Sequence, residues 1–312
     1  MTKPFKHLFG PVPSRRLGLS LGVDLLLPKT CSLDCVYCES GKTTRLTTQR
    51  STCVSPFDVI SELDDFLSTR PVLDHITFSG WGEPVLNTGI ARVVQHLKTC
   101  YPEYPTALLT NGTLFYMKQA REDVKDIDLI IASLDAVSPG VFQALNRPHP
   151  DLDPDKIVQG LIDLRSEFTH ELWLEIFIVP GLNDTDEELL KLSEAAGRIR
   201  ADKIQLNTLD RPGTEAWVKP AEKSDLERIS RYFETLEITG RESCEGMEKL
   251  GEEKNCDEMI LQLVMRRPCT CEDMVKSLGF SKEWIDVCLK RLMEDQRIRP
   301  VKMERGVFYR IM

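Results

Sequence analysis

The chain has 312 residues and carries 40 Lys and Arg against 49 Asp and Glu, a formal net charge of −9. At about 100–200 residues per domain, this length predicts two or three domains. The composition, 41% hydrophobic and 29% charged, is typical of a globular protein and excludes a wholly disordered chain. No apolar run approaches the ~20 residues of a membrane-spanning helix. Residues 1–16 lack the apolar segment of a secretory signal, so we expect a cytoplasmic protein with no membrane contact.

Short apolar runs alternate with helix-patterned segments along most of the chain. The runs predict six strands, at residues 22–27, 74–79, 106–110, 128–134, 172–179 and 203–208. The predicted helices include 55–69 with Ser55 as N-cap, 154–168, and a helix that a capping box at Ser224 opens and that continues to about 237. This alternation favours a parallel sheet with right-handed crossovers, either open or curled into a full or partial barrel. In both arrangements chemistry gathers at the C-terminal ends of the strands.

The pattern changes near residue 239. Residues 239–257 are polar and have no long apolar face, which predicts a linker between a core domain at 1–238 and a small domain at 258–312. The small domain is predicted to hold helices at 257–266, 270–278 and 281–294, with Thr270 and Ser281 as N-caps. Two strands around the turn at 304–306 complete the outline of a winged helix-turn-helix domain.

Three of the ten cysteines, Cys31, Cys35 and Cys38, lie within eight residues in the pattern C-x3-C-x2-C. Disulfides are not expected in a cytoplasmic chain, and a compact group of thiolates can hold soft metal ions. A structural zinc knuckle is one reading, but zinc usually takes four protein ligands and no fourth Cys or His lies nearby. A 4Fe-4S cluster held by three cysteines leaves one iron open to a ligand from outside, which is a catalytic arrangement.

The triplet, with Tyr37 before its last cysteine, resembles the signature of the radical S-adenosylmethionine (SAM) enzymes. Further motifs of this superfamily follow three successive predicted strands, at 79–84 (SGWGEP), 110–114 (TNGTL) and 133–135 (SLD). Other segments are similar to a group of mostly uncharacterised iron–sulfur oxidoreductases related to the wybutosine-synthesis branch, namely 9–16 (FGPVPSRR), 22–24 (GVD), 146–148 (NRP) and 207–212 (NTLDRP).

This resemblance implies a fold, cofactors and a reaction. The fold is an α/β, partial (β/α)6 TIM-like barrel, and the cofactors are S-adenosylmethionine and a 4Fe-4S cluster on Cys31, Cys35 and Cys38. The cluster reductively cleaves SAM to a 5′-deoxyadenosyl radical, which abstracts a hydrogen from an unknown substrate. A low-potential electron donor of the flavodoxin or ferredoxin type is the implied reductant. No catalytic side chain is singled out.

The resemblance also implies which residues contact the cofactor. They are Tyr37, Gly80, Trp81, Gly82, Glu83, Asn111, Ser133, Asp135 and Arg211. The glycines let backbone approach the bound methionine closely. Tyr37 is expected near the adenine, with Ser133 and Asp135 on the ribose hydroxyls, although these two residues can equally cap a helix. Four arginines are candidates for a carboxylate or phosphate because a guanidinium fork matches such groups, namely Arg15, Arg16, Arg147 and Arg211.

Four later cysteines, Cys244, Cys256, Cys269 and Cys271, raise the hypothesis of a second cluster. Their spacing matches no known ligand pattern, and Cys269 and Cys271 flank the predicted N-cap Thr270. A structural role is therefore the favoured reading. Cys100 and Cys288 fall on predicted helices and are interpreted as small buried apolar residues.

The charge of the chain is unevenly distributed. Residues 259–312 carry eleven Lys and Arg against seven Asp and Glu, so this segment is at +4 and the rest at −13. A basic small domain fits a nucleic acid such as a tRNA, a peptide, or a second protomer. Two functions follow: a radical enzyme whose C-terminal domain presents the substrate, or an iron–sulfur and SAM-sensing winged-helix binding protein without turnover.

Overall fold

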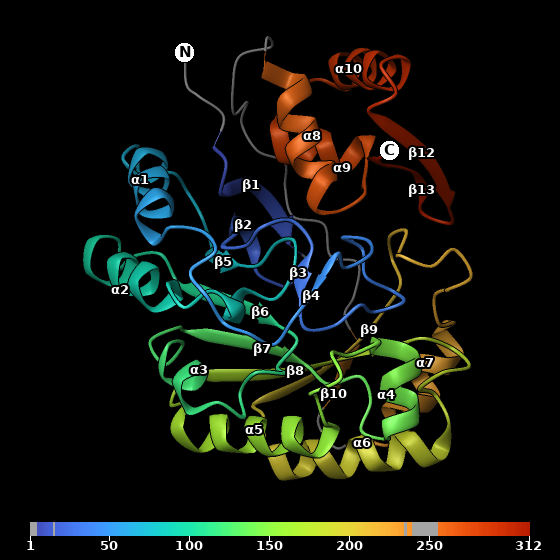
Figure 1. Cartoon of the computed structure of the whole chain (residues 1–312). Helices are drawn as coiled ribbons and strands as arrows, with labels where there is room; N and C mark the ends of the chain where they lie inside the picture. Colours follow the sequence, from blue (N-terminus) through green and yellow to red (C-terminus); the bar gives the residue numbers. More distant parts are fainter. Residues whose placement is uncertain (1–4, 15, 234–235, 239–254) are drawn as a thin grey trace.

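The computed structural model describes residues 5–14, 16–233, 236–238 and 255–312. An eight-stranded sheet organises most of the chain, in the order β1-β2-β5-β6-β7-β8-β9-β10 (Figure 1). All neighbouring strands from β2 to β10 pair in parallel, and β1 pairs antiparallel with β2. The predicted parallel α/β sheet is therefore confirmed, with β1 and β10 as its two edges.

The six predicted strands occupy the middle of this sheet. They are β2 (Gly18–Val23), β5 (His75–Phe78), β6 (Thr106–Thr110), β7 (Leu129–Ser133), β8 (Glu171–Ile178) and β9 (Lys203–Thr208). β2 lies earlier than predicted because it pairs with β1 (Leu8–Ser14), a strand that the sequence did not predict. Its prolines, Pro11 and Pro13, break the strand pattern and are tolerated because β1 is an edge strand.

The helix predicted from Ser224 to about 237 was wrong at both ends. α7 (Lys223–Ser230) is capped by Glu222, whose side chain forms a capping box with Asp225. The chain then turns back into the sheet as β10 (Leu236–Ile238), parallel to β9.

Helices cover the outer side of the sheet (Figure 1). They are α1 (Pro56–Leu67), α2 (Ile90–Cys100), α3 (Lys118–Glu122), α4 (Pro139–Asn146), α5 (Pro154–Glu167) and α6 (Asp186–Ile199). Ser55 precedes α1 as predicted, although its side chain makes no cap hydrogen bond. The main core lies between these helices and the sheet, and Ile76, Phe78 and Leu108 are fully buried in it. Within the described residues, no helix is both long and apolar enough to cross a membrane.

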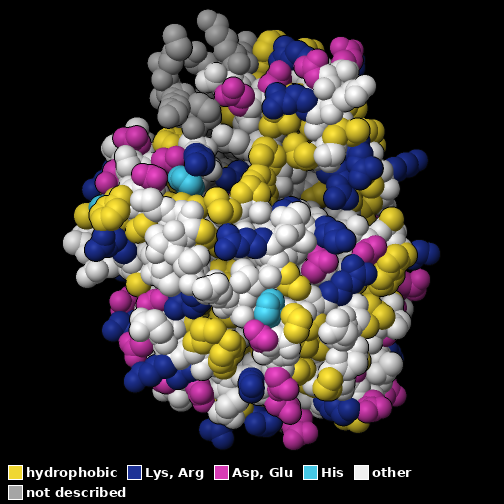
Figure 2. All heavy atoms as spheres, in the orientation of Figure 1, with side chains coloured by type: hydrophobic (Ala, Val, Ile, Leu, Met, Phe, Trp, Pro, Cys, Tyr) yellow, Lys and Arg dark blue, Asp and Glu magenta, His cyan; other side chains and the backbone are white. Residues whose placement is uncertain are grey.

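Residues 256–312 form a second packed unit, here called the C-terminal module. It contains α8 (Cys256–Arg266), β11 (Cys269–Thr270), α9 (Cys271–Leu278), α10 (Lys282–Glu294), β12 (Ile298–Met303) and β13 (Gly306–Ile311). The three predicted helices and the predicted hairpin are all present, and the hydroxyls of Thr270 and Ser281 cap α9 and α10 as expected. β11 was not predicted and pairs with β13. Figure 2 shows Lys and Arg side chains on the side of the molecule where this module lies.

The module has its own apolar core, and the rest of the chain contributes to it. Ile260, Met274, Ile285 and Cys288 are buried there, together with Val12 from β1. The hairpin of β1 and β2 is thus shared by both units, and the module lies against the β1 edge of the sheet (Figure 1). Most of the predicted linker, residues 239–254, lies outside the described residues.

Candidate active-site cavity

A cavity of about 400 Å³ lies at the C-terminal ends of the parallel strands. Its walls come from the ends of five successive strands, β5 to β9, from the loop after β3 (Thr30–Cys31), from the hairpin of β1 and β2, and from the end of α8. Ten of the residues predicted for the site line it: Cys31, Cys35, Tyr37, Cys38, Gly80, Gly82, Glu83, Asn111, Ser133 and Arg211. The exceptions are Trp81 and Asp135, which do not line it.

The loop that carries the three cysteines is fixed by hydrogen bonds. The backbone N–H of Val36 donates to Leu145 at 3.0 Å, and that of Cys38 donates to Cys35 at 3.2 Å. Two asparagines approach the sulfurs: the Nδ2 of Asn111 lies 3.5 Å from the Sγ of Cys31. The Nδ2 of Asn146 lies 3.4 Å from the Sγ of Cys35. Amide donors are therefore already aimed at two of the three predicted ligands.

The cysteines fit an iron–sulfur cluster better than a single ion. Burial raises the pKa of Cys31 to about 12 and also raises the pKa values of Cys35 and Cys38. Thiolates in such a cavity therefore need a cationic partner. Among the described residues, no three His, Cys, Asp or Glu side chains are grouped tightly enough to hold one metal ion. Three thiols that line the same cavity fit a cluster in which each cysteine takes a different iron.

Both predicted glycines are required by contacts within the protein itself. A Cβ on Gly80, whose φ is 147°, would lie 2.3 Å from the carboxyl carbon of Asp24. A Cβ on Gly82 would lie 1.8 Å from the carbonyl oxygen of Thr30. These glycines let the segment after β5 pack against its neighbours in the chain. The expectation that they also let backbone approach a bound methionine stays a prediction.

Glu83 joins the ends of two strands. Its buried carboxylate accepts hydrogen bonds from the N–H of Val85 at 3.0 Å, the Oγ1 of Thr110 at 2.7 Å and the N–H of Asn111 at 2.7 Å. Burial raises the pKa of Glu83 to about 6. Glu83 thus positions Asn111, which in turn contacts Cys31.

Tyr37 and Asp135 form a second supporting group. The hydroxyl of Tyr37 donates to Asp135, and its ring stacks on Phe177 with the ring centroids 4.0 Å apart. Asp135 also accepts from the Nδ2 of Asn146 at 3.0 Å and from the N–H of Phe177 at 2.8 Å. The carboxylate of Asp135 is thus buried and bonded to protein donors, and its predicted contact with a ribose stays a prediction. Ser133 remains at the cavity wall.

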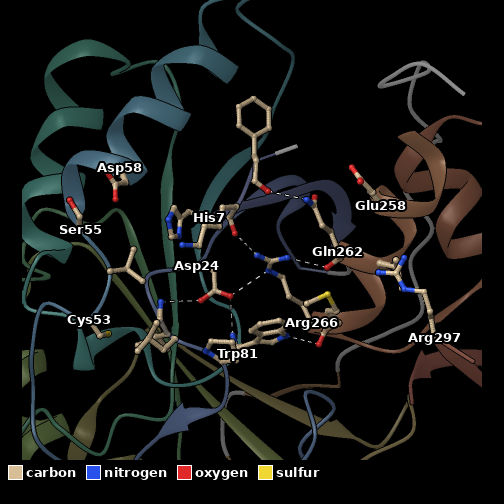
Figure 3. Close-up of a pocket in the computed structure, with 18 residues that line it drawn as sticks. His7, Asp24, Cys53, Ser55, Asp58, Trp81, Glu258, Gln262, Arg266 and Arg297 are labelled. Atoms are coloured by element: carbon tan, nitrogen blue, oxygen red, sulfur yellow. Dashed lines mark hydrogen bonds and ion pairs between the residues drawn. The ribbon is translucent and has the colours of Figure 1, made fainter. Parts of the chain in front are cut away.

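The side chain of Trp81 turns away from the cavity, and its predicted role in cofactor binding stays a prediction. Its indole N–H donates to the carbonyl oxygen of Met265 at the end of α8. It lines a second pocket of about 510 Å³ between α1 and α8 (Figure 3). There the guanidinium of Arg266 lies over the Trp81 ring at 5.5 Å and 3.4 Å from the carboxylate of Asp24. Trp81 therefore joins the sheet to the C-terminal module.

Arg211 has a similar role at the end of β9. Its side chain is buried and lines the cavity, but its Nη1 donates to the carbonyl oxygen of Pro268 at 2.8 Å and to Asp273 at 2.9 Å. Arg305 of the module also donates to Asp273. These donors anchor the module to the sheet, and the predicted cofactor contact of Arg211 stays a prediction.

The other candidate arginines are paired or not described. Arg16 forms an ion pair with Glu175 inside the cavity. Arg147 pairs with Glu215 at 2.6 Å. Arg15 lies outside the described residues. The sequence did not predict Arg266 and Arg267, which reach the cavity from the C-terminal module. The motif at residues 146–148 was noted, but the sequence did not predict that Asn146 lies beside a cysteine sulfur.

The later cysteines make separate contacts. The Sγ of Cys269 donates to the carbonyl oxygen of Arg267 at 3.4 Å, and the Sγ of Cys271 donates to Asp286 at 3.3 Å. Cys256 is buried beside Cys288. Cys244 lies outside the described residues. These contacts favour the structural reading over a second cluster.

Comparison with known proteins identifies the family. The model of the radical SAM superfamily matches residues 25–193. A UPF0026 protein of Methanocaldococcus jannaschii is 32% identical over 308 residues, which covers 96% of this chain and 94% of that protein. A protein named GTPase Obg from Brachyspira hyodysenteriae is 34% identical over 297 residues, which covers 94% of this chain. The chain spans only 43% of that longer relative.

Solved structures share the fold. A radical SAM methyltransferase from Sphaerobacter thermophilus has a TM-score of 0.55 at 15% identity, with 70% of this chain and 65% of that chain covered. TYW1 with a lysine-pyruvate adduct bound has a TM-score of 0.50 at 16% identity, with 72% and 74% covered. The predicted resemblance to the radical SAM enzymes is confirmed, and TYW1 shares the fold.

Proposed function

The chain belongs to the radical SAM superfamily, with a 4Fe-4S cluster and S-adenosylmethionine as cofactors, and we propose that Cys31, Cys35 and Cys38 hold that cluster in an active enzyme. One observation carries the proposal. The three cysteines share a cavity of about 400 Å³ with residues from the ends of five parallel strands. This is the edge of a parallel sheet at which α/β enzymes gather their chemistry.

When bound and reduced by an external donor, the cluster would supply the electron that breaks the carbon–sulfur bond of SAM, and SAM would supply the radical that takes a hydrogen from the substrate. The chain's own residues tune and shield that chemistry. Donors from Asn111 and Asn146 reach two of the cysteine sulfurs, and hydrogen bonds to sulfur raise the reduction potential of a cluster. The β1 and β2 hairpin and the C-terminal module wall the cavity and restrict the access of water.

The remaining predicted residues divide into two roles in this proposal. Gly80, Gly82 and Ser133 line the cavity and are placed to offer backbone groups and a hydroxyl to SAM. Tyr37 offers its aromatic ring to SAM, and its hydroxyl donates a hydrogen bond to Asp135. Glu83 positions Asn111, while Trp81 and Arg211 join the site to the C-terminal module.

The C-terminal module is proposed to be a winged-helix domain that presents the substrate. Three helices followed by a hairpin support this reading, and the solvent-exposed Arg299 and Lys302 give its β12 strand a basic character. The substrate is proposed to be a nucleic acid or a peptide, and the reductant a flavodoxin or ferredoxin. A sensor without turnover is the alternative, since Arg266 and Arg267 place the module in direct contact with the cavity.

Anaerobic reconstitution with iron and sulfide tests the proposal. The wild-type chain, reduced with dithionite, should convert SAM to 5′-deoxyadenosine. Replacing Cys31, Cys35 or Cys38 with Ala should abolish both the cluster absorbance and the product. Cys53→Ala is the matched control, because Cys53 lines the second pocket and not the cavity, and it should retain both. An intact cluster that yields no 5′-deoxyadenosine would favour the sensor. Cluster absorbance that survives in the Ala variants would place the ligands elsewhere.

A further inference from the structure

Four of the described arginines line the active-site cavity, and three of them are neutralised by carboxylates. Arg16 pairs with Glu175. Arg211 pairs with Asp273 at 2.9 Å and lies 3.6 Å from Glu39. Arg266 pairs with Asp24 at 3.4 Å and is turned toward it in the second pocket (Figure 3). The fourth is Arg267.

Arg267 differs from the other three in its surroundings. Within the described part of the chain, its guanidinium makes no hydrogen bond and no close ion pair. The carboxylates of Asp273 and Glu39 act on it from a distance. Asp273 forms its close ion pairs with Arg211 and Arg305, and Glu39 pairs with Arg211. Burial lowers the pKa of Arg267, and the charge of Arg211 lowers it further. A half-buried cation with no close partner among the described residues is unfavourable, so this position favours an incoming anion.

The backbone around Arg267 is held on both sides. Its N–H donates to Leu263 at 3.1 Å as the cap of α8. The next residue, Pro268, accepts the hydrogen bond from Arg211, and the Arg267 carbonyl oxygen accepts from the thiol of Cys269 at 3.4 Å. The side chain is therefore presented to the cavity by a fixed backbone, which reduces the entropic cost of binding a ligand.

We propose that Arg267 binds an oxyanion of the substrate, a carboxylate or a phosphate, inside the cavity. This inference rests on the function proposed above and adds the chemical class of the substrate to it. The planar guanidinium fork matches both groups and forms charge-assisted hydrogen bonds to them. Because Arg267 belongs to the C-terminal module, the substrate site lies between the sheet and the module and is incomplete without the module.

The carboxylate of SAM is the competing occupant. The strand-end groups proposed for SAM are Gly80, Gly82 and Ser133, which lie at the ends of β5 and β7. Arg267 instead has Arg211, at the end of β9, and Glu39 as its charged neighbours. The two groups of residues belong to different parts of the wall, and this favours the substrate as the ligand of Arg267.

Anion binding to the reconstituted full-length chain tests the proposal. Isothermal titration calorimetry with inorganic phosphate and, separately, with malonate should detect binding of one of them in the presence of saturating SAM. The anion that binds distinguishes a phosphate from a carboxylate substrate. Arg267→Met should weaken this binding by about tenfold or more, as expected for a lost charge-assisted pair. Arg267→Lys should keep it within about threefold to tenfold of wild type.

Arg297→Met is the matched control, since Arg297 is an exposed arginine of the same module that lines the second pocket. It should bind the anion as wild type does, and SAM should bind Arg267→Met with unchanged affinity. Anion binding that Arg267→Met leaves intact would overturn the proposal. The proposal would also be overturned if Arg267→Met bound SAM more weakly and lost the anion at saturating SAM. Arg267 would then hold the cofactor. Failure of the proposed function gives a different result: no 5′-deoxyadenosine from the wild type, with anion binding preserved.

Discussion

The side chain of Asn111 lies 3.5 Å from the sulfur of Cys31, while its backbone N–H donates to Glu83 at 2.7 Å. A residue at the end of β6 is thus held by one buried carboxylate and aimed at one cluster ligand. The sulfur of Cys35 accepts a similar hydrogen bond from the side-chain amide of Asn146, at 3.4 Å. The two asparagines therefore provide hydrogen bonds through which the protein can adjust the cluster.

Asn111→Ala should lower the reduction potential of the cluster. Loss of a hydrogen bond to a ligating sulfur destabilises the reduced, more negative state. A bond of ~1 kcal/mol corresponds to about 40 mV for a one-electron couple. An anaerobic titration followed by electron paramagnetic resonance measures the change. Asn87→Ala is the control, because Asn87 donates only to the backbone oxygens of Leu25 and Val54 and should leave the potential unchanged. An unchanged potential in Asn111→Ala would contradict the assignment.

Much of the fold could be predicted because its signals are local. β6 and β9 begin and end at the predicted residues, since each is a short apolar run bounded by polar or turn residues. The cysteine triplet is also local, because three ligands within eight residues need only one loop to bring them together. β1 was not predicted because its own proline-containing sequence does not indicate a strand. It is a strand because it pairs with β2.

The roles of individual site residues were harder to predict because they depend on distant contacts. Arg211 is 62 residues from Asp273, and nothing near either residue indicates that they meet. Trp81 contacts Met265, 184 residues away, so its direction is set by the C-terminal module. Arg267 reaches the cavity for the same reason. A motif locates a strand end, whereas packing decides which side chains at that end face the ligand.

Glu83 should make the stability of the apoprotein depend on pH. Burial raises its pKa to about 6 from an ordinary value of 4.5. The native state therefore holds this proton more tightly than the unfolded state. The corresponding stabilisation is present in full below pH 4.5 and is lost as the pH rises through about 6, with a magnitude of about 2 kcal/mol.

Urea unfolding of wild type and Glu83→Gln between pH 4.5 and 7 measures this effect. The glutamine variant does not titrate, so the free energy of unfolding of wild type should fall relative to that of the variant by about 2 kcal/mol over this range. Groups common to both proteins cancel in the difference. A difference that stays constant with pH would show that Glu83 has the same pKa in the native and unfolded states.

Arg211→Met should loosen the C-terminal module. The variant loses the hydrogen bond to Pro268 and the ion pair with Asp273, both largely shielded from solvent, and we expect a loss of about 3 kcal/mol in the free energy of unfolding. Hydrogen exchange should become faster in α9. Arg291→Met is the control: Arg291 makes a two-pronged ion pair with Asp257, but its side chain is 49% exposed. Its loss should cost much less than that of Arg211, because solvent screens an exposed ion pair. Equal effects of the two variants would argue against Arg211 as an anchor.

Gly82→Ala should prevent the assembly of the cluster site. The new methyl group would lie 1.8 Å from the carbonyl oxygen of Thr30, the residue before Cys31, so the backbone that carries the first cysteine must move. Cluster absorbance after reconstitution should fall, and so should the melting temperature. Gly197→Ala is the matched control, because nothing lies within 4 Å of its added methyl group and the residue is exposed on α6. Alanine at that helical position should be neutral or stabilising by up to about 1 kcal/mol. If Gly82→Ala reconstitutes a full cluster, the close packing of Gly82 against Thr30 is not what positions Cys31.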